Sequence, residues 1–473
     1  MTSSSSVSMV LPCFRRTSQT HADIQEAPPT ESPQLTDISQ SSEFLPEEPP
    51  RSESISGRSA LGVGAASIVA AVAGIVILFV TSHALTPADN AEFLSFWAAL
   101  FFVCGVLGGV QAETTRAVGS ARNLPADTER AAGGRAPVLL SALIVGGCGA
   151  LAIVALSPLL ADYVFQRNTA AVIAALAVTA VLFPCHATLA GAAQGMDKWS
   201  LFAGQVSLEA LLRLAAIGAA AAISLPLVGL ELACLLALAA WIIMAVIFPG
   251  GRIALRARAD VPLGKLLRNT GHALVSAASS AALIVAFPIL LKLTTSQPEY
   301  ASSAPILLAI SLTRAPIMVP LQAFQGVALA EVVRNPKQGW KALRKPLLAL
   351  LGIGAIGAVA AWFIGPWLML FFGPAYAVGG WTLAAFTFAA ALMAILTLLG
   401  TVVIGLGHHR AYSAGWLTAT IVAVVLLLLP ASVEIRSILS LSLGPLAGIM
   451  VHAIALGRIV AAQGQDTPEP QRR

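Results

Sequence analysis

The sequence predicts an all-α, polytopic membrane protein with twelve transmembrane helices in two parallel six-helix bundles. Three observations predict this fold class. The 473-residue chain is 57% hydrophobic and 11% charged, with a mean hydropathy of +0.81, whereas about a quarter of the residues in a soluble domain are charged. A helix of about 20 residues is long enough to cross a bilayer, and a hydropathy window of this length finds twelve apolar segments. Basic residues collect in alternate connections between these segments.

The first 58 residues differ in composition from the rest of the chain. They are rich in Ser, Pro, Thr, Glu and Gln, and they contain eight acids and four arginines. Such a segment cannot bury enough apolar surface to offset its chain entropy. We therefore expect residues 1–58 to form a disordered cytoplasmic tail. They do not resemble a signal peptide, because the first long apolar run begins only near Ala60.

The twelve predicted spans divide evenly about a basic connection at residues 251–270. This division predicts an N-terminal bundle at 59–250, a C-terminal bundle at 271–458 and a C-terminal cytoplasmic tail at 459–473. Because six is an even number, the two halves have the same orientation, as in transporters built from parallel repeats. The predicted spans are Ala60–Ser82, Glu92–Thr114, Pro137–Leu159, Asn168–Gly191, Leu201–Ile223, Val228–Phe248, His272–Leu293, Ala301–Val327, Pro346–Phe371, Gly380–Ile404, Ala411–Leu429 and Ile438–Leu456.

The distribution of basic residues predicts the orientation of these spans. With the N-terminal tail in the cytoplasm, 23 of the 28 Lys and Arg residues lie on the cytoplasmic side and three lie outside. Arg213 and Arg314 lie within spans. This bias agrees with the positive-inside rule, so both termini are expected in the cytoplasm and the protein in the inner (cytoplasmic) membrane of the cell.

Three charged residues near the middle of spans are the main candidates for binding a substrate. Glu209 and Arg213 stand four residues apart on one helix face. Arg314 lies about 13 residues into the eighth span, roughly 20 Å along a helix. Charges at this depth usually face a bundle interior, a partner charge or a watery cavity. One acid and two arginines predict a cationic cavity for an anionic substrate; the alternative is an ion pair that joins helices.

Other polar residues are secondary candidates. Gln205, Gln322 and Gln325 are suited to bonding sugar hydroxyls, or to joining helices. Arg116 lies at the inner end of the second span, where snorkelling to the membrane surface is easy and is the favoured interpretation. The five cysteines form no CxxC or Cys/His pattern, so the sequence indicates no metal site, and it indicates no cofactor or nucleic-acid partner.

The sequence favours a protein that is not an enzyme. It contains no Walker A sequence and no HExxH. Asp89 and Glu92 superficially fit a membrane glycosyltransferase that uses a polyprenyl-phosphate sugar donor. Both lie at the edge of a short loop without room for an acceptor-binding domain, and Asp89 is well placed to cap the second span.

Two short motifs resemble those of a known group. The turn Gln194–Trp199 with the following helix segment Val206–Arg213 looks like a Gln-Gly turn and Glu-x-x-x-Arg helix, and Phe372–Tyr376 looks like a Phe-Gly-x-x-Tyr turn. Together with the twelve spans, they resemble the polysaccharide transporter branch, of the O-antigen flippase type, of the multidrug/oligosaccharidyl-lipid/polysaccharide (MOP) exporter superfamily. The resemblance covers roughly residues 60–458.

The resemblance implies a V-shaped, MOP flippase-like bundle that translocates a polyprenyl-diphosphate-linked oligosaccharide or cell-envelope polysaccharide precursor by alternating access. Arg213 and Arg314 would hold the diphosphate or acidic sugars, and Glu209 would pair with them or couple to an ion. The implied partners are the lipid-linked anionic glycan, membrane lipids, and glycosyltransferases or a polymerase of the same pathway. The first span carries no charge, unlike that of lipid II flippases, which argues against a peptidoglycan-precursor role.

A major-facilitator exporter of small molecules is the main rival, because it is also a parallel six-plus-six repeat. That fold normally carries an Asp in a Gly-x-x-x-Asp-Arg-x-Gly-Arg-like turn between spans two and three. The corresponding turn here, Thr114–Arg122, has no Asp.

Overall fold

The computed structural model describes residues 57–122, 134–159, 168–314, 317, 321 and 339–465. In this part of the chain all regular elements are helices, and one isolated β-bridge joins Pro137 to Arg258. The predicted N-terminal tail, residues 1–58, therefore lies almost entirely outside the described residues. Gln322 and Gln325 also lie outside them.

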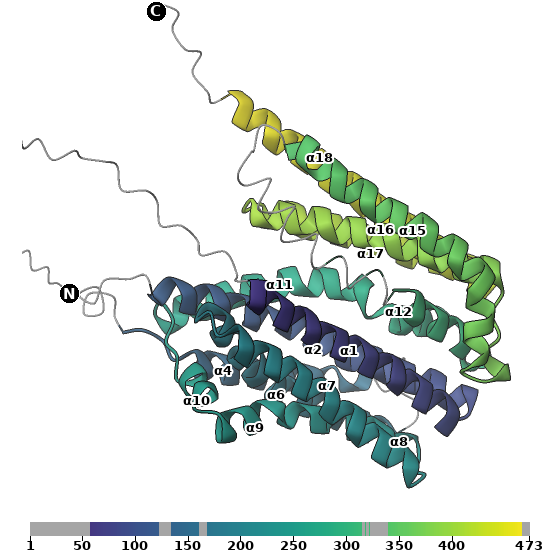
Figure 1. Ribbon diagram of the computed structural model, residues 1–473, viewed down its shortest axis with the longest axis horizontal. Helices are drawn as coiled ribbons and strands as arrows, with labels where there is room; N and C mark the ends of the chain where they lie inside the picture. Colours follow the sequence, from purple (N-terminus) through teal and green to yellow (C-terminus); the bar gives the residue numbers. More distant parts are fainter. Residues whose placement is uncertain are drawn as a thin grey trace, which may run out of the picture. The chain divides into compact units, whose positions relative to one another are not determined.

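The first half of the chain builds a group of helices shown in purple to teal in Figure 1. These are α1 (Gly57–Ala84), α2 (Pro87–Arg122), α4 (Val138–Ala155), α6 (Thr169–Gly195), α7 (Trp199–Ala222), α8 (Leu227–Ala233), η1 (Cys234–Ala239), α9 (Ala240–Ile247) and α10 (Pro249–Leu255). Residues of α8, η1 and α9 together form one membrane-length segment, Leu227–Ile247.

The second half contains a bent helix pair and four long helices. Its elements are α11 (Leu263–Ile284), α12 (Phe287–Leu293), α13 (Gln297–Ala301), the helix Ala304–Arg314, α15 (Gly339–Leu370), η3 (Pro374–Tyr376), α16 (Gly380–Gly405), α17 (His409–Leu427) and α18 (Val433–Gln465).

The long apolar helices confirm the predicted class of all-α, polytopic membrane protein. Among the described residues, ten helices are long and apolar enough to cross a membrane, and the total is eleven if the pair α11–α12, bent by 68°, is counted as one span. They match every predicted span except the eighth. That span begins with the helix Ala304–Arg314, and most of its remainder lies outside the described residues.

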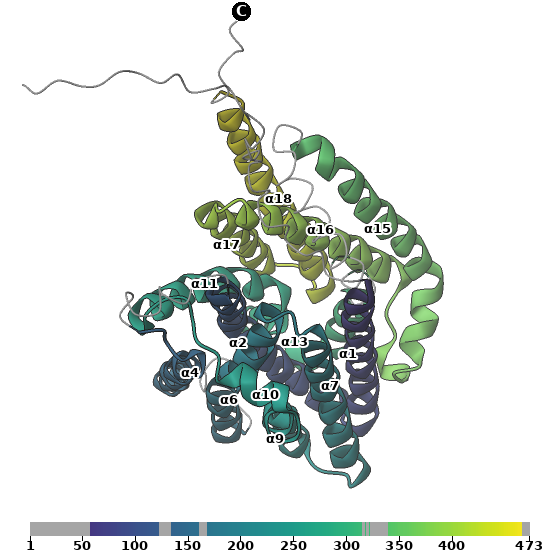
Figure 2. The same cartoon turned by 60° about the vertical axis from the view of Figure 1, so that its left-hand side comes forward.

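Helix α2 packs against helices of both halves. Gly109 brings its backbone against α11, since a Cβ there would lie 2.7 Å from the carbonyl carbon of Ala273. A Cβ on Gly105 would lie 3.0 Å from that of Ala281. Small residues allow this close approach within a membrane. Helix α11 packs against both α2 and α17, and Figure 2 shows it between these two helices.

The predicted connection 251–270 is more structured than its composition suggested. Helix α11 begins at Leu263, before the predicted start at His272, and α10 occupies Pro249–Leu255. Between them the chain pairs with residues 136–138: Ala259 N donates to Ala136 O at 2.9 Å, and Val138 N donates to Ala257 O at 3.2 Å. At the other end of the chain, α18 continues to Gln465, into the predicted tail 459–473.

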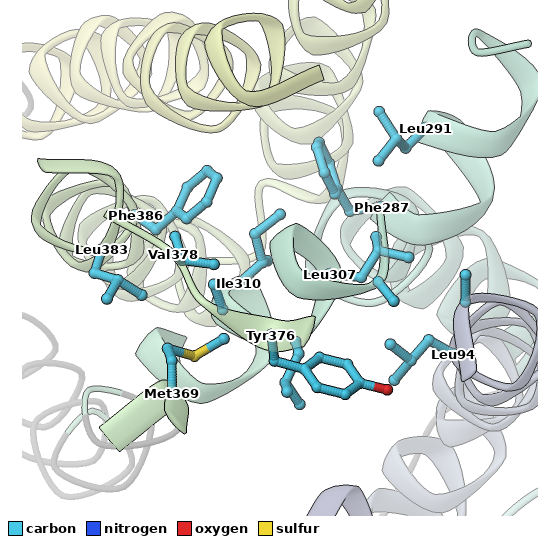
Figure 3. Packing of buried hydrophobic residues seen from close by; sticks show 14 of the residues in the cluster. Leu94, Phe287, Leu291, Leu307, Ile310, Met369, Tyr376, Val378, Leu383 and Phe386 are labelled. Carbon is cyan, nitrogen blue, oxygen red and sulfur yellow. The ribbon is translucent and has the colours of Figure 1, made fainter. Parts of the chain in front are cut away.

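The largest apolar core among the described residues lies near the start of α2 and joins it to the second half. It contains Leu94 of α2, Phe287 and Leu291 of α12, Leu307 of the following helix and Tyr376 of η3. Figure 3 shows the Tyr376 ring extending toward the helix that carries Leu94. This core fixes the second half against one end of α2.

Candidate functional site

Helix α7 presents a buried ion pair toward its neighbours in the first half. Glu209 and Arg213 are four residues apart, one helical turn, and their carboxylate and guanidinium are in direct contact. The exposed fractions of the two side chains are 18% and 10%. His186 of α6 adds a third titratable group, with its Nε2 3.4 Å from Glu209 Oε2. The sequence predicted the pair, whereas the partner from α6 was not predicted.

Aromatic side chains of α2 cover the Arg213 guanidinium. Its central carbon lies 4.8 Å from the ring centroid of Phe101 and 5.9 Å from that of Trp97. A guanidinium within about 6 Å of an aromatic ring is attracted to it electrostatically. Arg213 Nε is buried and has no hydrogen-bond partner in the described part of the chain. Arg213 is therefore held between α7 and α2.

Gln205 lies one turn before Glu209 on the same face of α7. Its Nε2 donates to the His186 carbonyl oxygen at 2.9 Å, and the side chain is fully buried. Its Oε1 is buried without a hydrogen-bond partner among the described residues. Gln205, Glu209 and Arg213 thus form one polar stripe on α7, within contact of α6 and α2.

Arg314 lies at the break between α11 and α12. Its Nη1 donates to the carbonyl oxygen of Ile284 at 2.7 Å. In a continuous helix that carbonyl would accept from residue 288, but residue 288 is Pro and has no N–H. The guanidinium also lies over the Phe287 ring, 5.9 Å from its centroid. Arg314 therefore replaces the donor that Pro288 removes.

The second amino group of Arg314 has no such partner. Its Nη2 is buried without a hydrogen-bond partner among the described residues. The contacts of Arg213 are with α2 and α7, whereas those of Arg314 are with α11 and α12. Joint binding of one substrate by the two arginines remains a prediction.

Arg116, whose side chain is 42% exposed, makes contacts that join the two halves near Arg122, the residue that ends α2. It binds Glu113 of α2 through Nε at 2.9 Å, and Asp260, which precedes α11, through Nη1 at 2.9 Å. Glu113 also accepts from Asn269 Nδ2 of α11 at 3.1 Å. The sequence did not predict the contacts with Asp260 and Asn269, which follow Arg116 and Glu113 by 144 and 156 residues.

Polar contacts also join the halves near Pro87, at the start of α2. Glu92 pairs with Lys292 of α12, and the hydroxyls of Ser95 and Tyr300 are in hydrogen-bond contact. Asn90 Nδ2 donates to Tyr376 Oη at 2.9 Å. Burial raises the pKa of Tyr376 above its usual value, although this hydrogen bond acts in the opposite direction. None of these partners was predicted.

These contacts also assign Asp89 and Glu92, the two acids compared above with those of a glycosyltransferase. Asp89 N donates to Thr86 Oγ1 at 3.2 Å, and the Thr86 hydroxyl donates to Asp89 Oδ2 at 2.8 Å. This reciprocal arrangement confirms Asp89 as part of the α2 cap. Glu92 belongs to the ion pair with Lys292.

Solved structures show which fold this arrangement has. No family model matches the chain. The inward-facing structure of a multidrug resistance MATE family transporter of the MOP superfamily has a TM-score of 0.65 at 14% identity, covering 86% of this chain and 100% of that one. The lipid II flippase MurJ, in an inward closed conformation, has a TM-score of 0.60 at 12% identity, covering 87% and 94%. The chain therefore has the fold of MOP superfamily transporters.

Curated sequences are more closely similar. The uncharacterized protein Rv1510 of Mycobacterium tuberculosis is 37% identical over 397 residues, which cover 84% of this chain and 91% of Rv1510. The uncharacterized protein Rv3630 of the same species is 36% identical over 407 residues, covering 85% and 93%. The chain accordingly belongs to the same family as Rv1510 and Rv3630.

Proposed function

We propose that this protein is a membrane transporter that moves a polyprenyl-diphosphate-linked oligosaccharide, or a related anionic cell-envelope precursor, across the cytoplasmic membrane by alternating access. The fold supports transport, since it is shared with a MATE transporter and with a lipid II flippase. The motifs at Gln194–Trp199 and Glu209–Arg213 favour the polysaccharide branch over other branches of the superfamily.

The environment of Arg314 is the single observation that supports an anionic substrate. A buried cation is costly unless its charge and its hydrogen-bond donors are satisfied. Arg213 forms an ion pair with Glu209. Arg314, in contrast, donates a hydrogen bond to the neutral carbonyl of Ile284, and its Nη2 has no hydrogen-bond partner among the described residues. A diphosphate or an acidic sugar would supply the negative charge and the acceptor that the described residues do not give this guanidinium.

Alternating access draws support from the contacts of α2. Polar groups join it to the second half near Pro87, through Glu92 and Lys292, and near Arg122, through Glu113 and Asn269. Hydrogen bonds and ion pairs of this kind can be exchanged for water when one end opens. In the proposed cycle the two sets of contacts open in turn, so that the interior faces one side of the membrane at a time.

In the proposed orientation both termini and the Arg122 end of α2 face the cytoplasm. This places the turn at Ser224 outside and the turn at His408 inside. A membrane-impermeant maleimide applied to intact cells should therefore label a cysteine at position 224 and should label one at 408 only after permeabilisation. The opposite labelling pattern would mean that the orientation, and with it the proposed direction of transport, is the reverse. Glycosyltransferases and a polymerase of the same pathway are the proposed partners on the two sides.

Substitution of Arg314 tests the anionic substrate. In proteoliposomes carrying a fluorescent polyprenyl-diphosphate saccharide, quenching from outside reports the probe that reaches the outer leaflet. Arg314→Gln should slow this movement at least about tenfold, because a charge-assisted contact is lost, and Arg314→Lys should retain part of the rate. Arg410→Gln, a change at an exposed cation in the first turn of α17, is the matched control.

The competing function is export of small molecules, which the likeness to a multidrug MATE transporter favours. The same proteoliposomes distinguish the two functions. Movement of a cationic dye that is unaffected by Arg314→Gln, together with no movement of the lipid-linked probe, would favour an exporter and contradict the proposed substrate.

A further inference from the structure

We propose that Arg436, near the start of α18, is the positioning residue for the outer opening of the molecule. It binds the α12–α13 segment, residues 287–301, to the rest of the second half, so that this segment parts from α2 when the outer end opens. The inference rests on the alternating-access cycle proposed above, and it adds the place at which the outer opening occurs.

The α12–α13 segment is not a rigid continuation of α11. Val285 and Ala286 separate α11 from α12, and the helix axis bends by 68° at this break. The segment itself consists of helices of only seven and five residues. Helices this short are marginal on their own, so their position depends on the neighbours that they contact.

On one side, the segment contacts α2 of the first half. Lys292 pairs with Glu92, and the Tyr300 hydroxyl is in hydrogen-bond contact with that of Ser95. The same Tyr300 hydroxyl lies 3.4 Å from the carbonyl oxygen of Ala91. Taken alone, these contacts would make the segment move with the first half.

On the other side, a single guanidinium binds the segment to α17 and α18. Arg436 Nη1 donates to Thr294 O at 2.9 Å and to Leu427 O at 3.2 Å. Its Nη2 donates to Thr295 Oγ1 at 3.1 Å and lies 3.1 Å from Glu299 Oε2. Thr294 caps α12 and Leu427 ends α17, so Arg436 supplies donors to the C-terminal carbonyls of two helices.

The contacts of Arg436 are harder to exchange for water than those of Lys292. The Arg436 side chain is 7% exposed, and it makes four charge-assisted contacts in the described part of the chain. Separating a buried guanidinium from its acceptors leaves an uncompensated charge. An ammonium group, in contrast, is a compact and strongly hydrated charge on a flexible stem. We therefore expect the outer end to open between Lys292 and Glu92.

Two buried residues distinguish the two possible openings. Ser95 of α2 is fully buried and faces Tyr300 of the segment. Leu441 of α18 is 2% exposed and belongs to the same apolar core as Leu291 of α12. Water reaches Ser95 if the segment parts from α2, and it reaches Leu441 if the segment parts from α18.

The test places a single cysteine at Ser95 or at Leu441 in the full chain without its five native cysteines. A membrane-impermeant maleimide is applied to intact cells. With Arg436 present, Ser95→Cys should react at least about tenfold faster than Leu441→Cys. With Arg436→Gln, the segment stays on α2 and the order of the two rates should reverse. Arg458→Gln, a change at an exposed cation on the same helix, should leave the order unchanged.

Two further variants separate positioning from stability. Arg436→Lys keeps the charge but loses the planar fork, so it should give an intermediate ratio of the two rates. Glu299→Gln is included in case Arg436→Gln does not reach the membrane, and it should change the ratio in the same direction by a smaller factor. Faster labelling at both positions with Arg436→Gln would indicate a purely structural role and would overturn the inference.

The remaining outcomes separate this inference from the proposed function. An unchanged order of rates in Arg436→Gln and Glu299→Gln, or no labelling of Ser95→Cys with Arg436 present, would also overturn it. Movement of the lipid-linked probe is measured on the same proteins. The expected labelling pattern without any movement of the probe would contradict the proposed substrate, and it would support the role of Arg436 in the outer opening.

Discussion

Glu209 and Arg213 are a buried pair in which each residue limits the cost of burying the other. Both side chains are less than one-fifth exposed, and Phe101 covers the guanidinium on the α2 side. Removing one member of such a pair leaves an uncompensated charge, which typically costs about 3–5 kcal/mol. Replacing both members with apolar side chains is often neutral, because neither charge then has to be desolvated.

Glu209→Ala should therefore lower the free energy of unfolding by about 3 kcal/mol, and Glu209→Ala with Arg213→Met should recover most of that loss. The free energy is measured by titrating the protein from mild into denaturing detergent. Ser200→Ala, a change at an exposed position on the same helix, is the control. If the double variant is as unstable as Glu209→Ala alone, the pair does not stabilise the fold in the way argued here.

At this scale the sequence predicted contacts within one helix and missed contacts between helices. The four-residue spacing was enough to predict the Glu209–Arg213 pair. The contacts of His186 and Trp97 with this pair depend on the rotation of α6 and α2 about their axes. Almost uniformly apolar helices carry little periodic signal that defines this rotation. The contact of Arg314 with Ile284 was not predicted, and its mid-depth position in the membrane remains a prediction.

Among the helices, the break between α11 and α12 has an identifiable cause. Proline 288 removes the donor for the Ile284 carbonyl, the axis bends by 68°, and Arg314 supplies the missing hydrogen bond. A proline inside a span frees a backbone carbonyl that needs another donor. The sequence did not predict which side chain would supply this hydrogen bond, because Arg314 follows Ile284 by 30 residues.

Pro288→Ala should restore the helical donor and straighten α11–α12. Spin labels at Val275 and Leu293, both exposed, report the change in a background without the five native cysteines. In a straight helix the 18 intervening steps span about 27 Å, and a bend of 68° shortens this by about 4 Å. The label distance should therefore lengthen by about 4 Å in the variant. An unchanged distance would mean that packing against α2, rather than Pro288, causes the bend.

For the molecule as a whole, the sequence predicted the membrane class and the spans better than their packing. Hydropathy and charge located eleven spans that the structure reproduces, and the start of the eighth. The central role of α2 was not predicted, because its partners Lys292 and Asn269 lie in the other half of the chain. The glycines that allow α11 to pack closely against α2, such as Gly109, give no sequence signal that identifies the helix they contact.

That packing yields a test of alternating access that does not depend on the substrate. Cysteine pairs are placed at three contacts in a background without native cysteines: Glu92 with Lys292 near Pro87, Glu113 with Asn269 near Arg122, and Gln111 with Gln194 within the first half. Crosslinking either of the first two should stop movement of the lipid-linked probe, and a reductant should restore it. Each of these crosslinks prevents one of the two openings that the proposed cycle requires.

The third pair controls for the crosslinking chemistry itself. Gln111 Nε2 lies 3.1 Å from Gln194 Oε1, and both residues belong to helices of the first half, so this crosslink should leave transport within about twofold of the reduced protein. A crosslink near Pro87 that blocks transport, with a crosslink near Arg122 that does not, would show that the halves separate at one end only. Continued transport with both ends crosslinked would contradict a mechanism in which the halves part, because α2 and α11 would then have remained joined throughout the cycle.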